Sequence, residues 1–249
     1  MAQPDQRDNI ANRLLLALPQ ATLQRMASAL EPVELTRGQV IDHVDAYIEH
    51  LYFVNRGIIS LVKTMHDGRT VEIGAVGIEG MTTPSALFGL DQAAIESIVQ
   101  LPGAAFRLKR DMLRAEMARD EATRTVMQKY ARFAIGALAQ TAACNRLHSL
   151  EARCCRWLLI AHDSARSDSF ELTHEFLAMM LGVQRAGVSI VASLLRKSGL
   201  IQYTRGRVTI AYREGLEEAA CECYGAMRTE LDKIFRGNGT FTAQRERAD

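Results

Sequence analysis

Apolar and polar residues alternate in short runs through the chain up to about residue 109. The runs "HLYFVN", "GIISLVKT", "RTVEIGAV", "ESIVQL" and "GAAFRL" have the two-residue period of β-strands. Asp67-Gly68, which lies between two such runs, is a strong hairpin signal. A short helix ending at Pro32 is expected before the strands. Many short strands at this spacing predict a sandwich or barrel.

After residue 109 the pattern changes to that of helices. A short helix is predicted over 110–117 and a long one over about 123–147. Apolar residues of the long helix cannot share one stripe, which predicts burial on two faces. One face would cover the β-domain and the other a second copy, with close approach at Ala131, Ala134 and Ala142. Burial within one chain is the alternative. The next helix, "SLEARCCRWLLIAHD", has one apolar stripe.

The segment "LTHEFLAMMLGVQRAGVSIVASLLRKSGLI", residues 172–201, predicts two helices across a tight turn. Thr173 is placed to cap the first helix, over 174–181, and Gly182 supplies the turn. In the second helix, which begins near Gln184, an apolar stripe over 188–195 faces inward. The segment "QYTRGRVTI" then predicts a hairpin around Arg205-Gly206. This order is typical of a winged helix-turn-helix, whose second helix enters the major groove.

Charge supports a polyanionic partner. The net charge of the whole chain is +1, but residues 172–207 hold five Lys or Arg and one acidic residue. A helical hairpin packed on another part of the protein is the alternative. The residues predicted to contact DNA bases or phosphates are Thr173, Gln184, Arg185, Ser189, Arg196, Lys197, Arg205 and Arg207.

The same segment resembles the C-terminal motif of the Crp/Fnr transcription regulators, L-T-x-x-x-L-A-x-x-x-G-x-x-R-x-x-V-S followed by G-L-I. "HLYFVNRGIISLVK" is similar to the β-roll signature of that family. The resemblance implies an α+β fold: an antiparallel β-roll (jelly roll) over 15–115, a dimerisation helix over 116–147 and a winged helix-turn-helix domain over 148–213. An extra helix and a mobile tail would occupy 214–249.

The resemblance also implies partners. They are a second copy of the chain, a near-palindromic site in double-stranded DNA, and RNA polymerase. The family's base-reading positions fall on Arg185, Ala186 and Ile190, where the best-known members carry Glu in place of Ala186 and Arg in place of Ile190. Because Ala186 and Ile190 cannot make those hydrogen bonds, the operator is expected to differ. Ile190 is expected to contact a thymine methyl group.

The effector is less constrained. Members that bind a cyclic nucleotide hold its phosphate with an arginine, but residues 71–106 contain no Lys or Arg. Burying an anion without a counter-charge is costly, so cAMP is not the expected ligand and no cofactor is predicted. The apolar segment "MTTPSALFGL" could line a pocket for a small neutral effector, or the β-roll could be a scaffold without ligand.

Other classes of protein fit poorly. Neither H-x-H, nor Gly-x-Ser-x-Gly, nor a phosphate loop occurs, so no catalytic residue is predicted; a β-roll interaction protein without specific DNA binding remains the alternative. The five cysteines lack C-x-x-C spacing and are expected to be structural thiols, not metal ligands. No secretory signal or membrane-length apolar run occurs, which predicts a cytoplasmic protein.

Overall fold

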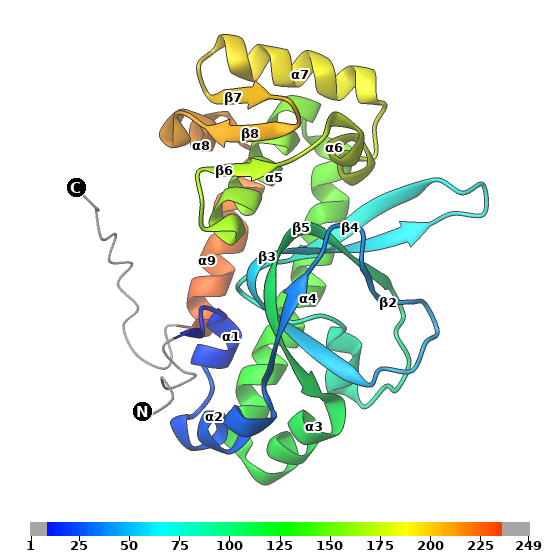
Figure 1. Ribbon diagram of the computed structural model, residues 1–249, viewed down its shortest axis with the longest axis vertical. Coiled ribbons are helices and arrows are strands. Elements are labelled where there is room, and N and C mark those ends of the chain that lie inside the picture. Colours follow the sequence, from blue (N-terminus) through cyan, green and yellow to red (C-terminus); the bar gives the residue numbers. More distant parts are fainter. Residues whose placement is uncertain (1–8, 236–249) are drawn as a thin grey trace.

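The computed structural model describes residues 9–235. A β-domain forms one end of the molecule, a small helical domain with a three-stranded sheet forms the other, and a long helix runs beside both (Figure 1). The fold class is therefore α+β, as predicted. The tail predicted to be mobile lies outside the described residues.

The β-domain is one antiparallel sheet. Its strands follow the order β1-β5-β3-β4, and β2 also pairs with β5. The bounds are β1 (Glu31–Leu35), β2 (Val40–Asp42), β3 (His50–Thr64), β4 (Thr70–Val76) and β5 (Glu96–Lys109). The hairpin predicted at Asp67-Gly68 is confirmed, since Gly68 has a φ of +83° in the turn between β3 and β4.

Two pairs of runs that the sequence analysis treated as separate strands are continuous. "HLYFVN" and "GIISLVKT" both belong to β3, and "ESIVQL" and "GAAFRL" both belong to β5. The glycines between them sit where the register of the β3–β5 ladder shifts. A Cβ on Gly57 would lie 2.5 Å from the Leu101 carbonyl oxygen, and one on Gly103 would lie 2.0 Å from that of Arg56. These glycines therefore permit close strand approach at bulges, and the strands do not end there.

The N-terminal helices are shorter than predicted. They are α1 (Arg13–Leu16) and α2 (Gln20–Met26), followed by a 3-10 turn, η2 (Ala27–Ala29). Pro32 lies within β1 and does not end a helix. A second 3-10 turn, η3 (Pro84–Phe88), lies in the connection between β4 and β5.

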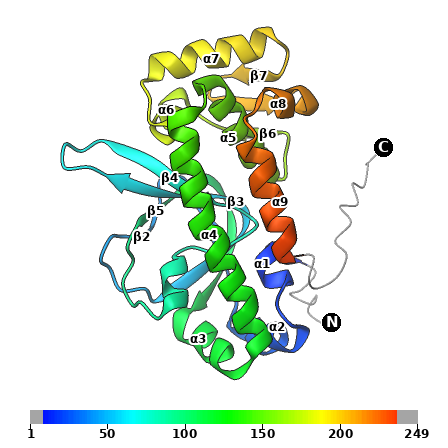
Figure 2. The same cartoon turned by 180° about the vertical axis from the view of Figure 1, so that it is seen from behind.

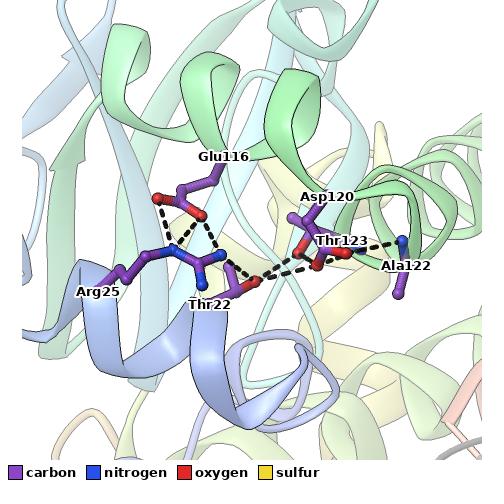
Figure 3. Close-up of polar contacts among 6 residues, drawn as sticks. All are labelled: Thr22, Arg25, Glu116, Asp120, Ala122 and Thr123. Carbon is purple, nitrogen blue, oxygen red and sulfur yellow. Dashed lines mark hydrogen bonds and ion pairs between the residues drawn. The ribbon is translucent and has the colours of Figure 1, made fainter.

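The long helix α4 (Glu121–Leu147) follows α3 (Arg110–Arg119), so the boundary expected at residue 116 falls inside α3. Asp120 ends α3 and caps α4 by accepting hydrogen bonds from the backbone of Ala122 and Thr123. Thr22 of α2 donates to the same carboxylate at 3.1 Å (Figure 3). One turn away, Arg25 forms a two-pronged pair with Glu116, 2.9 Å from Nε to Oε2. These contacts fix α2 across the α3–α4 corner.

The inward face of α4 packs on the β-domain (Figure 2), and Met127 and Tyr130 are buried there. Ala131 was expected in a seam between two copies, but it is only 3% exposed within the single chain. The outward face is also partly apolar, since Ile135 is 58% exposed and Leu147 is 76% exposed. Three small residues between them are exposed as well: Gly136, Ala139 and Ala142.

The second domain follows directly. Its elements are α5 (Leu150–Ala165), β6 (Ser169–Glu171), α6 (His174–Leu181), α7 (Arg185–Lys197), β7 (Ile201–Thr204), β8 (Arg207–Ile210) and α8 (Arg213–Ala219). The predicted hairpin is β7–β8. Its sheet has a third strand, β6, which pairs with β8 and was not predicted.

The extra C-terminal helix predicted after residue 213 is two helices. After α8 the chain breaks, and α9 (Cys223–Phe235) runs back beside α4 toward α1 (Figure 2). Its far end is held there by an ion pair of 3.1 Å between Arg13 and Asp232. The Arg13 guanidinium also lies 4.7 Å from the centre of the Phe235 ring. The C-terminal extension therefore connects the two ends of the molecule.

Candidate nucleic-acid interface

Two helices meet at a sharp turn at the outer end of the second domain. The chain bends by 109° between α6 and α7, within the range of helix-turn-helix units. Thr173 caps α6 by accepting a hydrogen bond from the Phe176 amide at 3.2 Å, as predicted. Gly182 ends α6 with a φ of +63°, a conformation that favours glycine. A Cβ there would also lie 3.0 Å from the Val71 side chain of β4.

The inward stripe of α7 holds the helix in place. Val188 is 0% exposed and Leu195 is 1% exposed, and both belong to the core that contains Trp157 and Leu177. Val191 and Ala192 are buried on the same side. Because this stripe is buried against the rest of the domain, the opposite face of α7 is the one available to a partner. Figure 1 shows α7 at the end of the molecule most distant from α3.

The N-terminal outer face of α7 carries one cation among apolar residues. Arg185 and Ala186 are exposed, and Ile190 is 72% exposed. Nε of Arg185 lies 2.9 Å from Glu175 Oε1 on α6. Both side chains are more than half exposed, so this pair adds little stability and a phosphate or guanine can replace it. Glu175 was not predicted as a partner of Arg185, although it is the one acidic residue in the segment 172–207.

Ser189 differs from the other predicted contact residues because its hydroxyl points to α6. Its Oγ lies 3.0 Å from Nδ1 of His174. The His174 ring lies against Tyr203 of β7, with 4.5 Å between ring centres. Burial, aided by Arg185, lowers the pKa of His174 and favours the neutral ring. Ser189, His174 and Tyr203 therefore connect both helices to the wing.

The wing carries two of the predicted cations. Arg205 and Gly206 have φ values of +49° and +77°, the conformation of a two-residue hairpin turn. The wing lies beside the start of α6, because the Leu172 amide donates to the Gly206 carbonyl at 2.8 Å. Arg207 is 3.8 Å from Glu171. Thr173 and the wing thus lie on one side of the helix-turn-helix.

The structure brings most of the predicted residues to one surface. Thr173, Gln184 and Arg185 lie at the turn, and Gln184 is the N-cap of α7. Arg196 and Lys197 occupy the last turn of α7. Within the described part of the chain, no ion pair engages Arg196, Lys197 or Arg205. Exposed cations without acidic partners, spread over about the length of α7, form a surface suited to a phosphate backbone.

The described helices do not include a single helix long and apolar enough to span a membrane. Taken together, the bent pair α6–α7 has the length and the apolar composition of a membrane span, but no more than that points to one.

Comparison with known proteins identifies the domain. Residues 152–219 match the family described as the Crp-like helix-turn-helix domain. No curated protein sequence matches the chain. Among solved structures, FixK2 from Bradyrhizobium japonicum is similar, with 16% identity and a TM-score of 0.59 over 77% of this chain and 98% of that one.

Two further solved structures have the same fold. The c-di-GMP responsive global regulator CLP of Xanthomonas campestris aligns with 14% identity and a TM-score of 0.58, over 78% of this chain and 100% of that one. A CRP-family transcriptional regulator from Thermus thermophilus has 22% identity and a TM-score of 0.55, over 76% and 96%. At these identities the likeness shows the fold.

The match over 152–219 and the outward-facing, partly basic helix α7 define a DNA-binding domain of the winged helix-turn-helix class. The chain therefore contains a Crp-like helix-turn-helix domain over residues 152–219, and most of its length has the fold of solved structures described as Crp/Fnr-type regulators.

Proposed function

We propose that two copies of the chain pair through α4 and bind a near-palindromic site in double-stranded DNA, one α7 in each half-site. The observation that carries this proposal is the division of α7 into a buried stripe and an exposed, partly basic face. A twofold dimer places its two reading helices one DNA turn apart, roughly 34 Å. Arg185 would contact base edges, while Arg196, Lys197, Arg205 and Arg207 would contact phosphates.

Genomic footprinting of the full chain finds the sites, and gel shifts at several salt concentrations measure the affinity. Arg185→Ala should lower affinity for the specific site by about tenfold or more and relax the base preference at one position. Arg114→Ala is the matched control, because Arg114 is exposed on α3 at the other end of the molecule. Equal binding of wild type and Arg185→Ala to the same sites would show that α7 is not the reading helix.

Ile190 is proposed to favour an A·T pair. Its side chain is exposed and cannot hydrogen-bond, but it can contact the methyl group of thymine. In a binding-site selection, Ile190→Ala should lose the preference for A·T at one position in each half-site. If wild type and variant select the same base there, the preference has another source, such as DNA shape.

The outward face of α4 is proposed as the dimer seam. Ile135 and Leu147 are exposed apolar residues, and the small residues Gly136 and Ala139 between them permit close helix approach. Ala139→Arg should give a monomer in light scattering and weaken DNA binding. Ala115→Arg places the same charge on an exposed position of α3 and should remain dimeric. A dimeric Ala139→Arg variant would move the interface elsewhere.

We infer that a small, largely apolar effector binds in a cavity of about 330 Å³ between β4, α4, α5 and α9. Ala75, Phe133 and Ile160 contribute apolar walls, and Pro84 of "MTTPSALFGL" reaches the cavity. The cations that the segment 71–106 lacks are supplied by other elements, Arg156 of α5 among them. Screening for ligands that raise the melting temperature tests this site. Ala75→Trp should remove the effect of a true ligand.

Contact with RNA polymerase is proposed for sites where the protein activates transcription. In vitro transcription from a footprinted promoter tests it. Stimulation by wild type supports the contact, and repression by occlusion argues against it.

A further inference from the structure

Four thiol and imidazole groups from two distant parts of the sequence lie together where α4 ends. Cys144 and His148 are one helical turn apart at the end of α4, and Cys221 and Cys223 lie at the break between α8 and α9. The four possible ligand atoms are all within 4.8 Å of one another. The sulfur atoms of Cys144 and Cys221 are 3.5 Å apart, and Cys223 Sγ is 3.5 Å from His148 Nδ1.

The two distances of 3.5 Å are close to the edges of a tetrahedral zinc site. Zinc binds thiolate sulfur at about 2.3 Å and imidazole nitrogen at about 2.0–2.1 Å. In a regular tetrahedron these lengths give about 3.8 Å between two sulfurs and about 3.5 Å between sulfur and nitrogen. A disulfide would need the two sulfurs at about 2.05 Å, so the free thiols of Cys144 and Cys221 are spaced for a shared ion.

His148 is oriented as a metal ligand. Its Nδ1 faces the thiols, while its Nε2 lies 3.1 Å from the Glu222 carboxylate. Such a carboxylate accepts a hydrogen bond from Nε2–H, which leaves the Nδ1 lone pair directed at the cluster, an arrangement common among zinc-bound histidines. Gln140 is 2.9 Å from Cys223 Sγ through Nε2, and can donate to a thiolate.

The surrounding charge also fits. Arg153 and Arg156 of α5 are 8% and 6% exposed, and both interact electrostatically with Cys144. Within residues 9–235, neither forms an ion pair, and the Nε atom of each has no hydrogen-bond partner. Three thiolates, one imidazole and Zn²⁺ carry a net charge of −1, which these guanidinium groups would balance.

We propose that Cys144, His148, Cys221 and Cys223 bind one Zn²⁺ ion in a closed structural site. The ion would join the end of α4 to the start of α9, the helix that returns to α1. The thiols lose their protons on binding, so affinity rises with pH. This site replaces the structural thiols expected from sequence, and it does not depend on the proposed mode of DNA binding.

The test uses the full chain purified under reducing conditions, with zinc measured by elemental analysis. About one zinc per chain is expected in wild type and much less in His148→Ala or Cys221→Ser. His148→Cys should keep the metal, because four thiolates also bind zinc. Cys154→Ser is the matched control, because Cys154 is buried on α5 outside the cluster.

Titration with Co²⁺ of wild-type protein whose metal has been removed by a chelator gives a second readout. Because it uses no variant, it does not depend on whether the variants fold. Tetrahedral thiolate coordination should produce a sulfur-to-cobalt charge-transfer band, and zinc should abolish it and restore the melting temperature lost on chelation. No metal and no cobalt band in fully reduced protein would overturn the proposal. So would a Cys144–Cys221 disulfide found by intact mass in the purified protein, or an equal loss of zinc in Cys154→Ser.

Discussion

The carboxyl group of Glu72 on β4 provides a sharp test of the interior of this protein. Glu72 is 6% exposed, and burial raises its pKa from 4.5 to about 7. Hydrogen bonding to Ser60 and the more distant charge of Arg156 oppose this shift without cancelling it. Replacing Glu72 by glutamine keeps the size of the side chain and removes its titration.

The hydrogen bonds around Glu72 also favour a protonated carboxyl. Ser60 Oγ lies against two oxygen atoms, Glu72 Oε2 at 2.5 Å and Gln100 Oε1. The hydroxyl has one proton and can donate to only one of them. A protonated Glu72 supplies the missing donor, so that Glu72 donates to Ser60 and Ser60 donates to Gln100. The amide introduced by Glu72→Gln can donate in the same way.

The magnitude follows from the shift. In the unfolded chain Glu72 ionises near pH 4.5, and in the folded protein it ionises near pH 7. The difference of about 2.5 pKa units, at about 1.36 kcal/mol each, equals about 3 kcal/mol. Because the folded pKa is raised, this stability is present below about pH 4.5. It is lost as pH rises to about 7, and the loss is complete above that.

The assay is urea denaturation of wild type and Glu72→Gln at one protein concentration, from about pH 5 to about pH 8. The difference in unfolding free energy should move in favour of Glu72→Gln by up to about 3 kcal/mol over this range. Burial also raises the pKa of Glu79. Because Glu79 is present in both proteins, its contribution cancels in the difference between them. A constant difference would refute the argument and show that Glu72 stays ionised, with the Gln100 amide turned to donate to Ser60.

Three further changes test the interface and the scaffold. Glu175→Ala should raise DNA affinity about threefold or more at low salt in a gel shift, because Arg185 loses a competing partner; unchanged affinity would mean that the pair does not restrain Arg185. Arg205→Asn should raise the unfolding free energy by up to about 1 kcal/mol, because asparagine tolerates a positive φ. The same change should lower the salt slope of DNA binding by about one, and an unchanged slope would show that Arg205 does not contact a phosphate. Asp120→Ala should lower the midpoint of urea denaturation, because α4 loses its cap, and an unchanged midpoint would mean that water replaces the cap.

Local patterns were enough to predict the helix-turn-helix. The Thr173 cap, the Gly182 turn and the positive-φ turn at Gly206 are each encoded within a few residues, and the structure confirms all three. The strands were wrongly predicted to end at Gly57 and Gly103, because a glycine at a bulge has the same local sequence pattern as a glycine that ends a strand. Only the pairing of β3 with β5 distinguishes the two.

Long-range contacts could not be predicted from one sequence. The C-x-x-x-H pair at the end of α4 and the C-x-C pair at the start of α9 are each weak signals of a metal site. They indicate a site only because the tertiary fold brings the two pairs together. The ion pair between Arg185 and Glu175 depends on the 109° bend between two helices. Pattern thus determines which face of α7 is exposed, whereas the neighbours of its polar groups depend on the tertiary fold.

The same fold brings the buried Glu72 cluster against the DNA-binding unit. Ser60, which forms a hydrogen bond with Glu72, lies 3.4 Å from the Met180 sulfur on α6. Val71, the residue before Glu72, packs so close to the turn that a Cβ on Gly182 would lie 3.0 Å from its side chain. A change of charge at Glu72 therefore acts one side chain away from the helix that positions α7. We expect the DNA affinity of wild type to vary between about pH 6 and about pH 8 more than that of Glu72→Gln. Parallel pH profiles of the two proteins would show that the cluster affects stability without affecting the reading helix.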